Sequence, residues 1–258
     1  MVGALVLGTA LPHLLRGLGE TLSWRQTLMV VSFLAVLGGG AVALWVPQGP
    51  FARRKGAFDP KALGAIFSQA DFRAAAFGYF GHMWELYAFW AFVPTIVAAY
   101  GQQHAGEFNV SLWSGLVIAV GALGCVGGGL WAQRAGSARV AATLLATSGL
   151  SCLLLPLVFW APAPVFVAFM LVWGLAVVGD SAQFSALSAQ TAPPGLVGSG
   201  LTIATSLGFA VTILSIEGLS ALSGVLPAQW LTVPLVLGPV AGLWSVRRLL
   251  KPALVAAS

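Results

Sequence analysis

The 258-residue sequence has 59% hydrophobic residues, only 7% charged residues and a mean hydropathy of +0.93. A soluble domain has about 25% charged residues, so this composition excludes a soluble protein and indicates a chain embedded in a lipid bilayer. The net charge of +5 is not accompanied by a basic face or an aromatic platform for nucleic acid. The basic residues are therefore expected to contact anionic lipid, and nucleic-acid binding is disfavoured.

Long apolar stretches follow one another along the whole chain. A membrane-spanning helix needs about 20 predominantly apolar residues. Stretches approaching that length lie at 2–18, 27–46, 74–99, 111–132, 140–160, 163–184, 197–221 and 229–247. They are continuously apolar, whereas the strands of a membrane β-barrel alternate apolar and polar residues. We therefore expect an all-α integral membrane protein with about eight transmembrane helices.

One polar segment interrupts the apolar stretches and divides the chain. Residues 47–73, PQGPFARRKGAFDPKALGAIFSQADFR, are rich in Pro, Gly and both signs of charge, which predicts a linker. The linker separates two spans at 1–46 from six spans at 74–258. VGALVLGTALPH near the start is loosely echoed by VGSGLTIATSLGF at 197–209. Taken as a repeat, this echo makes 1–46 the last two helices of a first six-helix half, with about four helices missing before them.

The distribution of basic residues predicts the orientation in the membrane. If the first span runs from the cytoplasm outward, only Arg16 and Arg25 of the twelve Lys and Arg residues lie outside. The inner loops and tail then hold Arg53, Arg54, Lys55, Lys61, Arg73, Arg134, Arg139, Arg247, Arg248 and Lys251. Cytoplasmic loops of membrane proteins carry an excess of Lys and Arg. The pattern predicts a cytoplasmic linker at 47–73 and a cytoplasmic C-terminus.

The stretch GYFGHMWELYAFW places two ionisable residues, His82 and Glu85, within an apolar span. On a helix they share one face with Gly78, and Tyr79 lies close beside that face. A charged side chain at the centre of a membrane helix costs about 2.5 to 3.5 kcal/mol on insertion scales, so we expect a cavity or a partner there. Two interpretations remain open: a proton-coupling site in a cavity, or a neutral hydrogen-bonded His82–Glu85 pair that fixes helix packing.

A second polar group lies in the sixth span, in GDSAQFSA. Asp180 and Gln183 are expected near the cytoplasmic end of that span, on a face with Trp173. They could line the mouth of a cavity, and solvation at the level of the headgroups is the competing interpretation. Glu217 lies near the outer end of the seventh span, where exposure at the membrane interface is favoured.

Neither a metal site nor a cofactor site is expected. The three His and seven acidic residues are dispersed along the sequence, whereas a metal site or an active site needs a cluster. A membrane-embedded enzyme is disfavoured for the same reason. Cys125 and Cys152 lie in apolar runs of different spans, which predicts buried thiols.

The turn between the fourth and fifth spans reads GLWAQRAGSAR. Its Gly129, Arg134, Gly136 and Arg139 match the loop Gly-x-x-x-Asp-Arg-x-Gly-x-x-Arg of the major facilitator superfamily, with Gln133 at the position of the Asp. Together with two helical units joined by a basic linker, this loop makes the chain resemble that superfamily. The expected function of the glycines is to let helix ends approach closely. The family's inward-closed latch uses the acidic residue, and Gln133 cannot make that ion pair.

The resemblance implies an architecture and a function. The superfamily's loop recurs after its second and eighth helices, so the present spans would be equivalent to helices 5 to 12 of an MFS-type bundle. The first helix of the second half, with His82 and Glu85, would line the central substrate cavity. The implied function is secondary active transport of a small solute, coupled to protons, by alternating access. GYFGHMWELYAFW and DSAQFSA resemble bacterial carriers, which implies a bacterial inner (plasma) membrane. The alternatives are a truncated, non-transporting fragment or a receptor-like relative.

Overall fold

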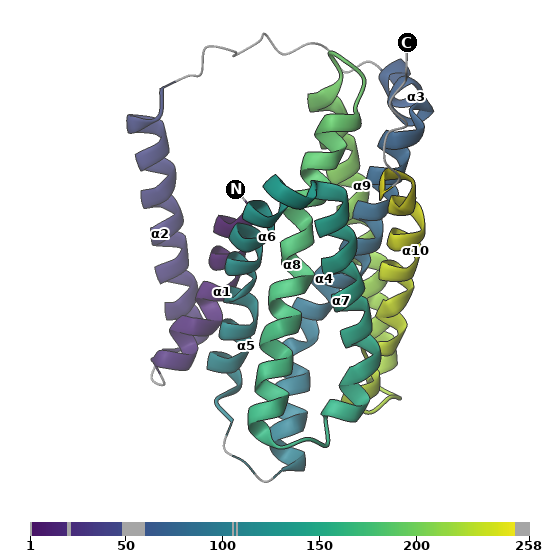
Figure 1. Ribbon diagram of the computed structural model, residues 1–258. Helices are drawn as coiled ribbons and strands as arrows, with labels where there is room; N and C mark the ends of the chain where they lie inside the picture. The colour runs from purple at the N-terminus through teal and green to yellow at the C-terminus, as the bar shows by residue number, and fades with distance from the viewer. Residues whose placement is uncertain (1, 20–21, 48–59, 105, 107, 251–258) are drawn as a thin grey trace.

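The computed structural model describes residues 2–19, 22–47, 60–104, 106 and 108–250, with the backbone alone at 60–63. Within this part of the chain every regular element is helical (Figure 1). The elements are α1 (Val2–Leu18), α2 (Trp24–Trp45), α3 (Pro60–Ser68), α4 (Ala70–Gln103), α5 (Val110–Ala119), α6 (Gly121–Ala135), α7 (Ser137–Val158), α8 (Ala163–Thr191), α9 (Val197–Ser223), η1 (Ala228–Trp230), η2 (Val233–Val236), α10 (Leu237–Val246) and η3 (Arg247–Leu250).

Six helical stretches in the described residues are long and apolar enough to cross a membrane. They are Trp24–Trp45, Val110–Ala135, Ser137–Val158, Ala163–Thr191, Val197–Ser223 and Ala228–Leu250. The chain is therefore an all-α protein with the character of an integral membrane protein, and six of the eight expected spans are confirmed as candidates. The other two expected spans fall on α1, which has only 17 residues, and on α4, whose 34 residues include His82 and Glu85.

The expected linker at 47–73 contains helical structure. Residues 60–68 form α3, and α4 begins at Ala70, four residues earlier than the span expected at 74–99. Asp71 lies in the first turn of α4, where a negative charge is favourable beside the unpaired amides of the helix start. Arg53, Arg54 and Lys55 lie outside the described residues, as do Lys251 and the C-terminus, for which a cytoplasmic location stays a prediction.

Basic residues gather at one end of the bundle. Figure 1 shows the end of α2, α3, the turn between α6 and α7, and the end of α10 at the upper end of the molecule. Arg134 lies in the last turn of α6, and Arg247 and Arg248 lie in η3. Arg16 and Arg25 flank the turn between α1 and α2, at the opposite end. The charges are thus divided between the two ends as the sequence predicts.

α4 runs through the middle of the bundle and packs against α8, α9 and α10. Glycines make the closest of these contacts possible, because a Cβ atom at Gly81 would lie 2.8 Å from Gly242 Cα of α10. α6 and α8 meet in the same way, since a Cβ at Gly179 would lie 3.0 Å from the carbonyl oxygen of Gly124. Small residues let helix backbones approach in a membrane. Glycines of α6 that face α8, such as Gly121 and Gly124, therefore allow the two helices to pack closely.

α1 and α2 lie at the edge of the bundle. α1 packs on α5 and α6, and the Asn109 side chain donates a hydrogen bond of 2.8 Å to the carbonyl oxygen of Gly17. α2 makes its principal contacts with α1, and Thr27 is its one buried residue among those described. The large apolar side chains of α2, including Phe33 and Trp45, are exposed.

Candidate functional site

Glu85 of α4 is fully buried and accepts hydrogen bonds from two neighbouring helices. The indole Nε1–H of Trp173, on α8, donates to Oε1 at 2.9 Å. The hydroxyl of Ser148, on α7, donates to Oε2 at 2.8 Å, and the thiol of Cys152 lies 3.3 Å from Oε1. Glu85 is 0% exposed, so these donors take the place of water around the carboxyl group. The carboxyl group therefore ties α4 to both α7 and α8.

Helical geometry explains why these donors reach one carboxyl group. Ser148 and Cys152 are four residues apart and so lie one above the other on the same face of α7. Phe89, one turn beyond Glu85 on α4, packs against Trp173 with a ring-centroid distance of 4.4 Å. This contact holds the indole ring beside α4 with its N–H at Glu85.

His82 and Asp180 form the second buried polar contact. His82 Nδ1 of α4 lies 2.8 Å from Oδ1 of Asp180 on α8, and the two residues are 1% and 0% exposed. The contact has the distance of an ion pair. Among the described residues, His82 Nε2 and both carboxylate oxygens of Asp180 have no hydrogen-bond partner.

Aromatic rings enclose the imidazole of His82. The ring of Tyr79, on the same helix, lies at a centroid distance of 5.8 Å from the imidazole. The ring of Phe184, on α8, lies at a centroid distance of 6.1 Å from it. Gly78 makes room for Phe184, because a Cβ atom there would lie 2.5 Å from the phenyl ring. Tyr79 itself is 9% exposed. The polar pair is thus surrounded by apolar rings, which keep the local dielectric low.

The hydrogen-bonded His82–Glu85 pair, one of the two interpretations that the sequence left open, does not form. The two side chains lie on the same helix, but Glu85 contacts Ser148, Cys152 and Trp173, whereas His82 contacts Asp180. The reason is tertiary, because neighbouring helices offer each side chain a closer partner than the other provides. The interpretation as a paired acid and imidazole is therefore wrong.

The predicted position of Asp180 is also wrong. The sequence suggested that its span ends at about residue 184, but α8 continues to Thr191 and buries Asp180 completely. Polar residues lower the apparent hydropathy of this stretch, while its small residues let α8 continue packed against α4, α6 and α7. Solvation at the headgroup level is excluded. Gln183 is 3% exposed and lies against α6, where its amide nitrogen is 3.7 Å from a Cβ built on Gly128.

The residues of the expected cytoplasmic loop form the turn between α6 and α7. Gln133, Arg134 and Arg139 are exposed there. A Cβ atom on Gly129 or Gly136 would meet nothing within 4 Å, so these glycines do not bring helix ends together as expected. Gly136 has a φ of +83°, a backbone conformation that residues with a Cβ rarely adopt. Its function is to make the turn.

Ser148 was not recognised from the sequence, and Cys152 was predicted only as a buried thiol. Both cysteines are free; Cys152 is buried and Cys125 is half-buried. The signal that could have found the site is a hydroxyl and a thiol spaced by one helical turn in an apolar span. Within the described part of the chain, no three His, Cys, Asp or Glu residues gather to hold a metal ion.

Two carboxyl groups and one imidazole thus lie inside a bundle of apolar helices. Buried ionisable groups of this kind can hold or exchange protons when water reaches them. These features define a class of protein: an all-helical membrane protein with a buried ionisable cluster that joins α4, α7 and α8. No protein-family model matches the chain, and no curated protein matches it either.

Proposed function

We propose that this chain belongs to a secondary transporter of the major facilitator type, which couples movement of a small solute to protons by alternating access. The observation that carries the proposal is the buried His82–Asp180 contact, which joins α4 to α8 through atoms that have no other partner. Ionisable residues inside membrane segments are rare and costly, and they mark substrate pathways and proton relays. If the contact between His82 and Asp180 served only to hold the helices together, we would expect its buried polar atoms to be hydrogen-bonded.

The two acids have different roles in this proposal. Glu85 accepts from Trp173 and Ser148, so it acts as an anchor that fixes the packing of α4 against its neighbours. Asp180 and His82 form the proton site, because their unpartnered atoms can accept a proton or a water molecule. Separation of α4 from α8 would admit water to the pair and allow proton exchange. Closure would seal the pair again among Tyr79 and Phe184.

The arrangement of helices supports the assignment to this type of carrier. In the proposal α4 to α10 form the second half, with α4 as its first helix, and α1 and α2 are the last helices of the first half. The packing of α1 on α5 and α6 is the kind of contact expected between two halves. The turn at Gly136 corresponds to the superfamily's cytoplasmic loop, without its acidic residue.

Transport in proteoliposomes tests the proposal. The purified chain, and a form extended in frame upstream of Met1, are assayed with a panel of small organic anions and cations under an imposed pH gradient. We expect gradient-driven uptake to be lost in Asp180→Asn and retained in Glu217→Gln, an exposed acid on α9. Solute counterflow without a gradient should persist in Asp180→Asn, which separates loss of coupling from loss of folding.

Three outcomes have distinct meanings. Unchanged gradient-driven uptake in Asp180→Asn would contradict the proton site. Uptake by the extended form alone would assign these residues to part of a larger carrier. Absence of uptake from both forms, in protein that is monodisperse and correctly folded, would favour the non-transporting alternative.

A further inference from the structure

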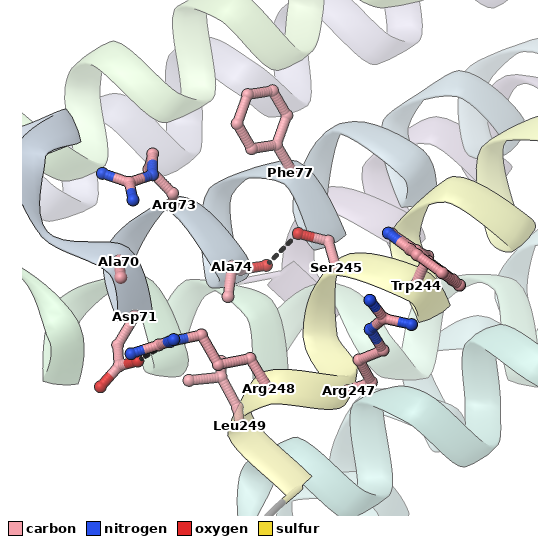
Figure 2. Close-up of a pocket in the computed structure, with 10 residues that line it drawn as sticks. All are labelled: Ala70, Asp71, Arg73, Ala74, Phe77, Trp244, Ser245, Arg247, Arg248 and Leu249. Atoms are coloured by element: carbon pink, nitrogen blue, oxygen red, sulfur yellow. Dashed lines mark hydrogen bonds and ion pairs between the residues drawn. The ribbon is translucent and has the colours of Figure 1, made fainter.

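Two adjoining pockets lie where the start of α4 meets the end of α10. The larger, of about 980 Å³, lies at the end of the bundle where basic residues gather (Figure 2). Its polar lining consists of Asp71, Arg73, Ser245, Arg247 and Arg248. Its apolar lining consists of Ala70, Ala74, Phe77, Trp244 and Leu249. The pocket is therefore charged at the bundle end and apolar toward the membrane interior.

The second pocket, of about 480 Å³, continues from the first along α4. The two pockets share Phe77, Trp244 and Ser245, so they form one groove. The apolar part is lined mainly by Phe80, Gly81, Trp84, Val211, Leu237 and Ala241. Phe77, Gly81 and Trp84 follow one another at helical spacing, so the groove runs along the axis of α4.

The charged part of the groove has an excess of positive charge. Three arginines face one aspartate there, which leaves two positive charges in excess. Arg248 Nε lies 2.6 Å from Asp71 Oδ1, and both side chains are more than half exposed, so this ion pair is open to solvent. The guanidinium of Arg247 lies over the indole of Trp244, 3.2 Å from the ring centroid. Among the described residues Arg247 makes no ion pair with an acid.

Arg73 is held on the other side of the pocket. One of its terminal nitrogens donates hydrogen bonds of 2.6 Å and 2.8 Å to the carbonyl oxygens of Phe67 and Ser68, at the end of α3. The guanidinium keeps further N–H donors for a ligand. Tryptophan is enriched at the membrane–water interface, and Trp244 with its stacked Arg247 lies at the end of α10. The charged part thus has the position of lipid headgroups.

The length of the groove matches one leaflet. From Asp71 to Trp84 the helix rises about 20 Å at 1.5 Å per residue. The hydrocarbon of one leaflet is about 15 Å thick, since the whole core is about 30 Å. The groove is therefore long enough for a headgroup at its charged end and an acyl chain along its apolar part.

We propose that this groove binds an anionic phospholipid. The phosphodiester lies at the charged end of the groove beside Arg247 and Arg248, and one acyl chain lies along Phe77 and Trp84. The proposal accounts for both parts of the groove, whereas a free phosphate ion would leave the apolar part unexplained. It concerns the exposed groove between α4 and α10 and goes beyond the proposed transport function.

Native mass spectrometry of the full chain in detergent micelles tests the proposal. The protein is titrated with phosphatidylglycerol or phosphatidylcholine of the same acyl chains, and the first bound lipid is counted. We expect a preference for phosphatidylglycerol, which falls about 25-fold in Arg247→Gln/Arg248→Gln, since each of the two arginines near an anionic surface contributes about fivefold. The control is Arg134→Gln/Arg139→Gln, which removes the same charge from exposed residues at the same end.

A second variant tests the apolar part. Ala241→Trp fills the groove without changing its charge and should reduce binding of phosphatidylglycerol, while size-exclusion chromatography confirms an intact fold. Soluble glycerol phosphate should fail to displace the lipid. Equal loss in both arginine variants, or absence of a preference in the unaltered chain, would overturn the proposal. Displacement by glycerol phosphate would indicate a free-anion site, and a dimer abolished by Ala241→Trp would indicate a second copy of the chain; either result would also overturn it.

Discussion

A double-mutant cycle between Trp173 and Glu85 measures the contact that joins α8 to α4. Trp173→Phe removes the indole N–H and keeps an aromatic ring against Phe89, while Glu85→Leu removes the acceptor. The cycle cancels the cavity and desolvation costs of each single change and leaves the coupling. Hydrogen bonds between membrane helices average about 0.6 kcal/mol with a maximum near 1.7 kcal/mol. A buried donor on a carboxyl group belongs at the upper end, so we expect about 1 to 1.5 kcal/mol.

The same cycle with Ser148→Ala should give a smaller coupling. The Ser148 hydroxyl has a second acceptor, the carbonyl oxygen of Leu145 at 3.2 Å, to which it can turn when Glu85 is absent. The indole of Trp173 has no such alternative among the hydrogen bonds of the described residues. The ranking of the two coupling energies therefore follows from the structure.

Reversible unfolding in mixed micelles, titrated with a denaturing detergent, gives the free energies of unfolding. Trp173→Phe combined with Glu217→Leu serves as the control and should be additive, because Glu217 is exposed on α9. A coupling near zero for Trp173 and Glu85, or a larger coupling for Ser148 and Glu85, would refute the assignment of Glu85 as an anchor to α8.

Four further predictions concern packing and accessibility. Gly81→Ala should lower the free energy of unfolding by about 1 to 3 kcal/mol, because its Cβ meets the backbone of α10. A Cβ atom at Gly127 would meet nothing within 4 Å, so Gly127→Ala should raise the free energy of unfolding by up to about 1 kcal/mol through helix propensity. The same detergent titration measures both variants, and equal effects would contradict the close contact between α4 and α10 at Gly81. Gly136→Ala should cost about 1 kcal/mol or more by that assay, because φ is +83°. A maleimide reagent should modify Cys152 only after unfolding, and Cys125→Ser isolates that thiol; rapid modification in the folded state would contradict its burial.

The spans could be predicted because their signal is local. The stretches found as α2, α7 and α9 are 22 to 27 residues long and predominantly apolar, as a membrane-spanning helix requires. Helix ends were harder to place where polar residues occur inside a span. The span of α8 was predicted to end at residue 184, because hydropathy counts Asp180 and Gln183 as polar whether or not another helix covers them.

The candidate site was predicted in part. A histidine and an acid in an apolar span indicated a partner or a cavity, and both residues are buried. Their partners could not be read from the sequence, because Glu85 meets Ser148 and Trp173 from 63 and 88 positions away. The proton-coupling role of these residues stays a prediction.

The sequence by itself determined that the chain is helical and belongs in a membrane, since burial of apolar residues in lipid depends on composition along one segment. It also determined which end of the bundle carries the basic residues. Only the tertiary structure decided that Glu85 is held by α7 and α8, and that His82 faces Asp180. The physical reason is that a buried polar atom pairs with whichever donor the packing brings within about 3 Å, and that choice depends on helix contacts between distant segments.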